Sequence, residues 1–157
     1  MGLPLTRGPS LRRATTADAE AVQRVAEAAY SPYLERMGGL RPGPLMTDYA
    51  AAMHETEAWV ALDGAVVVGF LLLVAEDDAM LLDNVAVLPS HHGRGVGRTL
   101  LELAESRAVA SGRRRIRLYT HVTMVENQAL YERTGYVETH RGGEEGMVRV
   151  FYEKELG

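Results

Sequence analysis

The sequence predicts a single mixed α/β domain built on a mostly antiparallel sheet flanked by helices. Three observations lead to this fold class. The chain has 157 residues, enough for one domain with a sizeable core. Patterns typical of helices and of strands follow one another along it, and short turns join the strands of its middle part. An apolar run at 85–88 is followed by glycines at every second position and then by a helical pattern.

Residues 1–10 are expected to form a flexible leader, with the folded domain spanning 11–157. The leader has one arginine and lacks the apolar segment of a signal peptide. A strand is expected at 11–15. Thr15 and Asp18, three residues apart, are typical of a short capping box, so a helix should begin there.

This first helix should end at Ser31-Pro32, because the residue before a proline disfavours helical backbone angles. A loop rich in proline and glycine follows at 32–44. A second short helix is expected from about residue 46 to residue 54.

The middle of the chain contains the clearest hairpin. Apolar strands at 58–62 and 65–75 flank the dipeptide Asp63-Gly64, which is a strong turn signal. A short acidic turn then leads into the next strand at 80–88.

The C-terminal part of the chain should alternate helices and strands. The helix that follows the glycines is expected to end at Gly112. The remaining expected elements are a strand at 116–120, a short helix at 127–133 that stops before Gly135, and a pair of strands at 136–140 and 147–154.

Composition excludes several classes of protein. The formal net charge of −4 argues against a general nucleic-acid binder. The absence of cysteine excludes disulfides, thiolate metal sites and a cysteine nucleophile. The five histidines show no metal-ligand spacing, so no metal is expected. No apolar run approaches the roughly 20 residues of a membrane span, so no membrane partner is expected and the cytoplasm is the expected location.

The glycines at 93, 95 and 97 predict a phosphate site, because glycine lets the backbone approach an anion and the next helix offers free amides. A dinucleotide fold requires Gly-x-Gly-x-x-Gly, and here the third glycine comes one residue early. A mononucleotide P-loop fails as well, since His92 stands at its first glycine position and Arg98 at its lysine.

A third pattern fits better. Residues 92–97 match [Gln/Arg]-x-x-Gly-x-[Gly/Ala] directly after a strand, apart from His92 at the first position. Residues 127–136 give a second motif, Asn-Gln-Ala-Leu-Tyr-Glu-Arg-Thr-Gly-Tyr. The strand-like segment Asn-Val-Ala-Val-Leu-Pro precedes the first motif, and Leu-Tyr-Thr lies between the two motifs. Together these features resemble the GCN5-related N-acetyltransferase (GNAT) superfamily. The resemblance covers roughly residues 58–152.

The resemblance implies acetyl-coenzyme A as cofactor and a sheet splayed between strands four and five. In this family the glycine loop binds the cofactor's pyrophosphate, and strand four pairs with its pantetheine arm. The positions that carry these roles here are Val85, Ala86, Val87, His92, Gly93, Arg94, Gly95, Val96, Gly97, Arg98, Asn127 and Tyr131. Alternative roles for two of them remain open: Arg98 could pair with Glu102, four residues on, and Asn127 could cap its helix.

The implied chemistry is the attack of a neutral amine on a thioester. The family places a tyrosine in the second motif as the acid that protonates the leaving thiolate, here Tyr131. The base that removes the amine proton is expected to be Asp83 or Glu76, with His121 a weaker third candidate.

The resemblance also places the acceptor between the loop after the first helix and the last hairpin. The first offers Tyr30, Tyr33, Met37, Leu40 and Met46, and the second offers Glu144 and Glu145. Asn84, Thr120 and His121 are further candidates for contact with the acceptor.

The resulting hypothesis is an acetyl-CoA-dependent N-acetyltransferase that acts on a primary amine, either of a small molecule or of a peptide or protein. The alternative is a non-catalytic acyl-CoA-binding module that senses the cofactor or serves as an assembly subunit. The resemblance also implies a possible homodimer.

Overall fold

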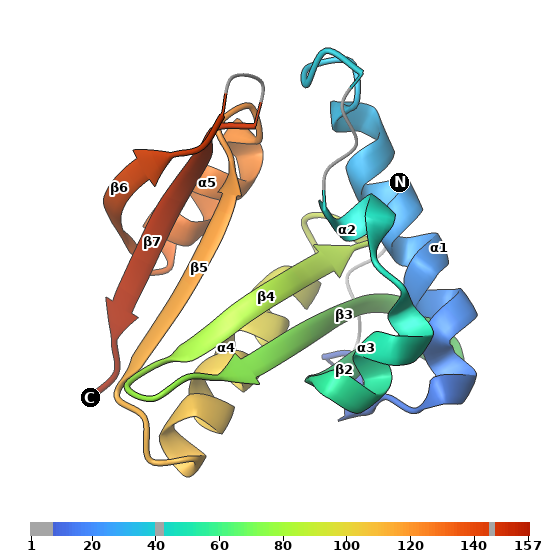
Figure 1. Cartoon of the computed structure of the whole chain (residues 1–157). Helices are drawn as coiled ribbons and strands as arrows, with labels where there is room; N and C mark the ends of the chain where they lie inside the picture. Colours follow the sequence, from blue (N-terminus) through green and yellow to red (C-terminus); the bar gives the residue numbers. More distant parts are fainter. Residues whose placement is uncertain (1–7, 40–42, 145–146) are drawn as a thin grey trace.

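A seven-stranded sheet organises the chain, in the spatial order β1-β2-β3-β4-β5-β7-β6 (Figure 1). The computed structural model describes residues 8–39, 43–144 and 147–157. The strands are β1 (Ser10–Arg13), β2 (Glu57–Asp63), β3 (Val66–Ala75), β4 (Met80–Val87), β5 (Arg115–His121), β6 (Val137–Gly142) and β7 (Arg149–Glu155). The helices are α1 (Ala19–Tyr30), α2 (Gly43–Met46), α3 (Tyr49–Glu55), α4 (Val96–Ala110) and α5 (Val125–Arg133), with 3₁₀ turns η1 (Thr16–Asp18), η2 (Ser31–Tyr33) and η3 (Pro89–His91).

All neighbouring strands pair antiparallel except β4 and β5, which run parallel because the crossover helix α4 connects them. Their pairing covers only Met80 with Ile116 and Leu81 with Arg117. Beyond these two pairs the strands diverge, and Figure 1 shows the gap widening between them. The predicted mixed fold, with its mostly antiparallel and splayed sheet, is confirmed.

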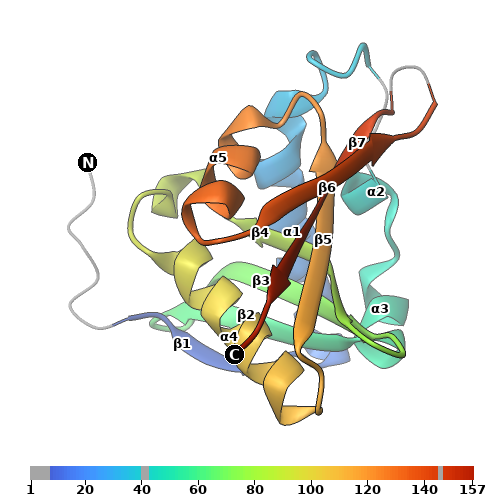
Figure 2. The ribbon, with the colours of Figure 1, turned by 90° about the vertical axis from the view of Figure 1, so that its left-hand side faces the viewer.

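The two faces of the sheet carry separate cores, and Figure 2 shows α4 and α5 on one side of it with α2 and α3 on the other. The first core joins α4 and α5 to the sheet, and Leu100, Ile116 and Tyr152 are buried in it. The second joins α1 and α3 to β2, β3 and β4, with Val22, Val25 and Phe70 buried.

A β-bulge in β4 decides which of its side chains enter which core. Leu72 of β3 faces Asn84, whereas the next residue, Leu73, faces Leu82, so Asp83 is an extra residue in the ladder. The alternation of side chains therefore shifts by one position at Asp83. Leu82 packs into the α4 core, while Asn84 turns toward α1 and α3, where it bonds Tyr30 and Tyr49.

The predicted capping box is present at the start of the first helical segment. The Asp18 carboxylate accepts the backbone N–H of Thr15 at 2.8 Å. It also accepts two hydrogen bonds from Arg12, at 2.8 and 2.9 Å, which attach β1 to this turn. The partner guanidinium and the cap together lower the pKa of Asp18 below its usual value.

Two details differ from the sequence prediction. The helix expected at 46–54 begins later, as α3, because Asp48 caps it by accepting the N–H of Ala51, and the short helix α2 precedes it in the expected loop. Helix α5 begins at Val125, so Asn127 lies inside its first turn and does not cap it. Most of the expected leader, residues 1–7, lies outside the described residues. Among the helices that the structure describes, none is long and apolar enough to cross a membrane.

We expect Leu100→Ala to lower the free energy of unfolding by about 2–5 kcal/mol, because it leaves a cavity between α4 and the sheet. Leu100 is fully buried, and its Cδ1 would stand 3.1 Å from a Cβ added at Gly69 of β3. Denaturant titration of both variants measures the effect. The control Val109→Ala changes a side chain that is 57% exposed on the same helix and should stay within about 0.5 kcal/mol. A loss below about 1 kcal/mol for Leu100→Ala would contradict this packing.

Candidate active site

Two cavities meet where β4 and β5 part. The larger, about 880 Å³, lies between the end of α1, the glycine loop, the start of α4 and helix α5. The smaller, about 70 Å³, lies between β4, β5, β7 and α2. Four residues line both: Tyr30, Val85, Asn127 and Tyr131. A molecule in the larger cavity and one in the smaller could therefore meet at these four side chains.

The glycine loop, for which the sequence predicts a phosphate site, forms one wall of the larger cavity. Gly93 and Gly95 have φ values of 78° and 84°, which side chains disfavour, and Gly95 is the residue from which α4 starts. The first helical bond of α4 runs from the N–H of Thr99 to the Gly95 carbonyl, at 3.0 Å. The amides of 96–98 precede it and have no carbonyl partner within the helix. They form a donor set for an anion, reinforced by the positive helix end.

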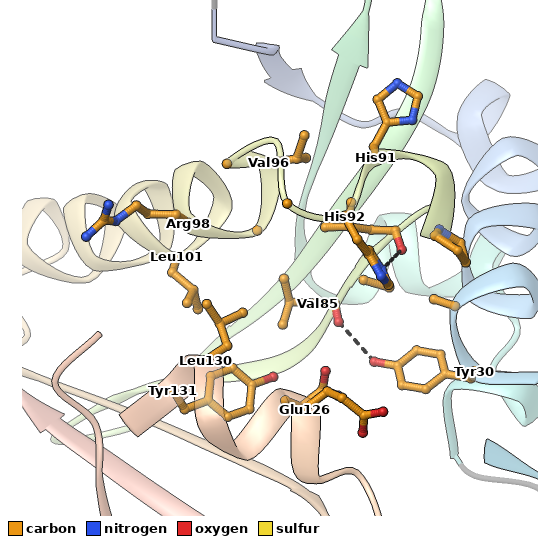
Figure 3. Close-up of a pocket in the computed structure, with 18 of the residues that line it drawn as sticks. Tyr30, Val85, His91, His92, Val96, Arg98, Leu101, Glu126, Leu130 and Tyr131 are labelled. Atoms are coloured by element: carbon orange, nitrogen blue, oxygen red, sulfur yellow. Dashed lines mark hydrogen bonds between the residues drawn. The ribbon is translucent and has the colours of Figure 1, made fainter. Parts of the chain in front are cut away.

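The unpaired edge of β4 offers acceptors to the same cavity. The Val85 carbonyl accepts the Tyr30 hydroxyl at 2.9 Å. The Val87 carbonyl lies 3.1 Å from His92 Nε2, a bond that requires the hydrogen on that nitrogen. Figure 3 shows both bonds as dashed lines. In a complete sheet, β5 would donate hydrogen bonds to these two carbonyls. Here two side chains donate to them instead, and each carbonyl keeps a second lone pair that can accept a ligand N–H.

Tyr131 lies at the junction of the two cavities. Its side chain is 4% exposed, and its ring packs against those of Tyr136 and Tyr152 at centroid distances of 6.0 and 5.8 Å. Among the described residues none is hydrogen-bonded to its hydroxyl, which Figure 3 shows pointing into the cavity opposite Tyr30. Burial raises the pKa of Tyr131 far above its ordinary value, so it stays protonated at neutral pH.

The two predicted carboxylates lie in different places. Asp83 occupies the bulge of β4, lines the smaller cavity and is partly buried, and this burial raises its pKa above the ordinary value of 3.8. Glu76 lines neither cavity and forms an ion pair with Arg117. It lies where β4 and β5 are still paired, at the closed end of the gap. The geometry therefore favours Asp83 as the base.

A buried chain of hydrogen bonds supports the site, and part of it escaped the sequence analysis. The Tyr30 hydroxyl lies 2.9 Å from Asn84 Oδ1, whose Nδ2 donates to the Tyr49 hydroxyl at 3.0 Å. Tyr49 donates in turn to the Pro44 carbonyl at 2.6 Å. Burial raises the pKa of Tyr49 to about 12, so this donor stays protonated. Tyr49 gave no signal in the sequence beyond its place on an apolar helix face.

An ion pair missed by the sequence analysis spans the mouth of the larger cavity. Arg36, after α1, donates two hydrogen bonds to Glu126 of α5 at 2.8 and 3.0 Å. Its guanidinium also lies over the Tyr33 ring, 4.8 Å from the centroid. These bonds lower the pKa of Glu126 to about 2. The pair connects the two halves of the chain that the gap separates.

The remaining predicted residues divide between the two cavities. Tyr33, Ala86, Gly97 and Arg98 line the larger one, and Thr120 and His121, both buried, line the smaller one. Arg94 lines neither. No ion pair joins Arg98 to Glu102 in the described part of the chain. Leu40, Glu145 and the side chain of Met46 lie outside the part of the chain that the structure describes.

The described residues contain no group of three or more histidine, aspartate or glutamate side chains that could hold a metal ion. The polar groups that line the two cavities include backbone amides and carbonyls, tyrosine hydroxyls, arginines and the carboxylates of Asp83 and Glu126. Such a set can bind an anion and an extended polar chain, and can move protons between a base and an acid.

Comparison with known proteins agrees with this geometry. The family model described as "Acetyltransferase (GNAT) family" matches residues 21–136. No curated protein matches the sequence.

Several solved structures share the fold. The PaiA N-acetyltransferase from Thermoplasma acidophilum, in complex with coenzyme A, has a TM-score of 0.81 at 17% identity, over 96% of this chain and 100% of that chain. The ribosomal-protein-S18-alanine N-acetyltransferase from Escherichia coli has a TM-score of 0.75 at 17% identity, over 94% of each chain. A GNAT family acetyltransferase from Elizabethkingia anophelis with acetyl-CoA bound has a TM-score of 0.70 at 16% identity, over 96% of this chain and 100% of that chain.

Proposed function

The chain belongs to the acetyltransferase (GNAT) family, whose cofactor is acetyl-CoA, and we propose that it transfers the acetyl group to a primary amine by direct attack. The observation that carries this proposal is the junction of two cavities at Tyr131, with Asp83 in the smaller one. One cavity has the size and donors for the cofactor, and the other leaves room for an amine beside a carboxylate.

The residues of the larger cavity fit the cofactor. The amides of 96–98 and Arg98 suit a pyrophosphate, which accepts hydrogen bonds and carries negative charge. The carbonyls of Val85 and Val87 suit the amide N–H groups of a pantetheine arm. Acetyl-CoA supplies the activated acetyl group as a thioester.

Asp83 and Tyr131 then divide the proton transfers. The acceptor enters as an ammonium with a pKa near 10 if it resembles lysine, and Asp83 takes its proton. The amine nitrogen bonds to the acetyl carbon as the carbon–sulfur bond breaks, and Tyr131 donates its hydroxyl proton to the departing sulfur. The second proton that the nitrogen loses as the amide forms then restores the Tyr131 phenol, and Asp83 releases its proton to water. Burial supports both roles, because it raises the affinity of the carboxylate for a proton and keeps the phenol protonated.

Acetyl-CoA should raise the melting temperature of the protein, whereas ATP and NAD should not. A ligand at 100 times its dissociation constant adds about 2.7 kcal/mol of stability, or roughly 2–8 °C for a domain of this size. A thermal-shift measurement with the three ligands in parallel tests this. A shift with ATP or NAD alone would show that the glycine loop serves a different cofactor.

Tyr131→Phe should lower kcat by roughly 10²–10⁴-fold while the dissociation constant of acetyl-CoA changes little, because only the proton donor is lost. Steady-state kinetics and a binding titration separate the two quantities. The matched control is Tyr136→Phe, whose hydroxyl bonds Glu105 at 3.0 Å and lines neither cavity. Unchanged kcat in Tyr131→Phe would remove this tyrosine as the acid.

The base should appear in the pH dependence of kcat. Asp83 works only when ionised, so kcat should fall as the pH falls through its pKa, which burial places above 3.8. Asp83→Asn should lower kcat by roughly 10²–10⁴-fold and remove this acidic limb. Glu76→Gln is measured in the same series. If Glu76→Gln removed the limb and Asp83→Asn kept it, the base would be Glu76.

A further inference from the structure

Resting on the proposed function, we infer that the acceptor is a small zwitterion of the amino-acid class. Its amine would lie at Asp83 and its carboxylate at Arg149. Both side chains line the smaller cavity, and in the described part of the chain neither one has a partner of opposite charge. The acceptor would therefore carry a carboxylate beside its reacting amine.

Arg149 of β7 differs from the two arginines of the neighbouring strand β5. Arg115, Arg117 and Tyr119 occupy every second position of β5, so their side chains share one face of the strand. Arg115 pairs with Glu155 at 3.0 Å, and Arg117 pairs with Glu76. Arg149 has no carboxylate among the described residues, and its guanidinium lies over the Tyr119 ring at 4.8 Å. Stacking fixes the plane of the guanidinium and leaves its N–H groups for a ligand.

Asp83 supplies the opposite charge in the same cavity. It has neither a hydrogen bond nor an ion pair with any described residue, and the cause of its raised pKa is burial alone. Burial is the main cause of the raised pKa of the neighbouring Tyr119, the Asp83 charge raises it further, and the Arg149 charge lowers it. Asp83, Tyr119 and Arg149 thus line one cavity, and no ion pair joins the two charges in the described part of the chain.

The rest of the cavity favours a small zwitterion over other amines. Arg149 is the one permanent cation among the described residues that line it, and Asp83 is the one carboxylate. A polyamine would place a second positive charge near Arg149, which is unfavourable. The smaller cavity, of about 70 Å³, has Met37, Pro44 and Met147 among its lining residues, so apolar side chains surround the two charges.

His121 does not replace Arg149 as the anion site. Its Nδ1 accepts the backbone N–H of Thr123 at 3.1 Å and lies 2.8 Å from the Thr123 hydroxyl. A nitrogen that accepts an N–H carries no hydrogen of its own, so Nδ1 cannot donate to a carboxylate in this arrangement. The guanidinium, which is charged at every physiological pH, therefore remains the cation for a carboxylate.

The test compares free amino acids with their C-terminal amides, which keep the amine and lose the anion. Acetyl-CoA, the full-length chain and each amine are mixed, and released coenzyme A is measured with a thiol reagent. The protein has no cysteine, so the reagent reports coenzyme A alone. The panel also includes spermidine and a lysine-containing peptide blocked at both ends. We expect kcat/KM to be roughly 10- to 100-fold higher for at least one free amino acid than for its amide.

Variants of Arg149 assign this preference to its side chain. Arg149→Gln should raise KM for the free amino acid and leave the kinetics of the amide unchanged, so that the two substrates become alike. Arg149→Lys, which keeps the charge, should restore part of the difference. The control is Arg114→Gln, because Arg114 is exposed and lines neither cavity. The melting temperature of each variant shows that it is folded.

The outcomes separate this inference from the proposed function. Equal rates for acids and amides, or acetylation of only spermidine or the peptide, would overturn the zwitterionic acceptor and leave the N-acetyltransferase intact. An equal loss for acid and amide in Arg149→Gln would show that Arg149 supports the fold and does not bind the carboxylate. Binding of acetyl-CoA without acetylation of any amine would overturn both proposals and favour a cofactor sensor.

Discussion

The site depends on the early end of the pairing between β4 and β5. A parallel pair that continued would bond the Val85 and Val87 carbonyls to β5 and close the space that both cavities share. Two residue pairs are enough to hold the strands in one sheet, and antiparallel ladders on both flanks keep the two halves rigid. The cost of the exposed edge is reduced because Tyr30 and His92 bond these carbonyls.

The bulge at Asp83 is the second device on which the gap depends. It shifts the alternation of β4, so that Asn84 enters the buried chain with Tyr30 and Tyr49 while Val85 packs toward α4. The same irregularity leaves Asp83 without a place in either core. A carboxylate that no described partner neutralises is thereby held against the smaller cavity, where its proton affinity is raised.

Local signals made much of the fold predictable. The capping residues Thr15 and Asp18, the turn at Asp63-Gly64 and the glycines before α4 each act over a few residues, so the sequence contains their whole cause. The glycine loop and Tyr131 could be predicted because they belong to contiguous motifs. What the sequence lacked were contacts between distant segments.

The bonds from Asn84 to Tyr49 and from Arg36 to Glu126 join positions 35 and 90 residues apart. A bulge likewise depends on the partner strand, so the different places of Asp83 and Glu76 emerged only from the pairing of β3 with β4. In the sequence, Arg149 resembles the other arginines of the strands. Only the structure shows that Arg115 and Arg117 form ion pairs, whereas Arg149 has no carboxylate partner among the described residues.

The fold also places the proposed acid and the proposed base so that they would not neutralise each other. Tyr131 lies at the junction on α5, on the face packed by α4, whereas Asp83 lines the smaller cavity from the bulged strand, on the side of α2 and β7. Direct proton exchange between them would be unproductive, and their placement on separate elements keeps the reacting atoms between them. In the proposed mechanism the substrate therefore completes the path for the protons, from its amine to Asp83 and from Tyr131 to the sulfur, and the reaction requires both cavities to be filled.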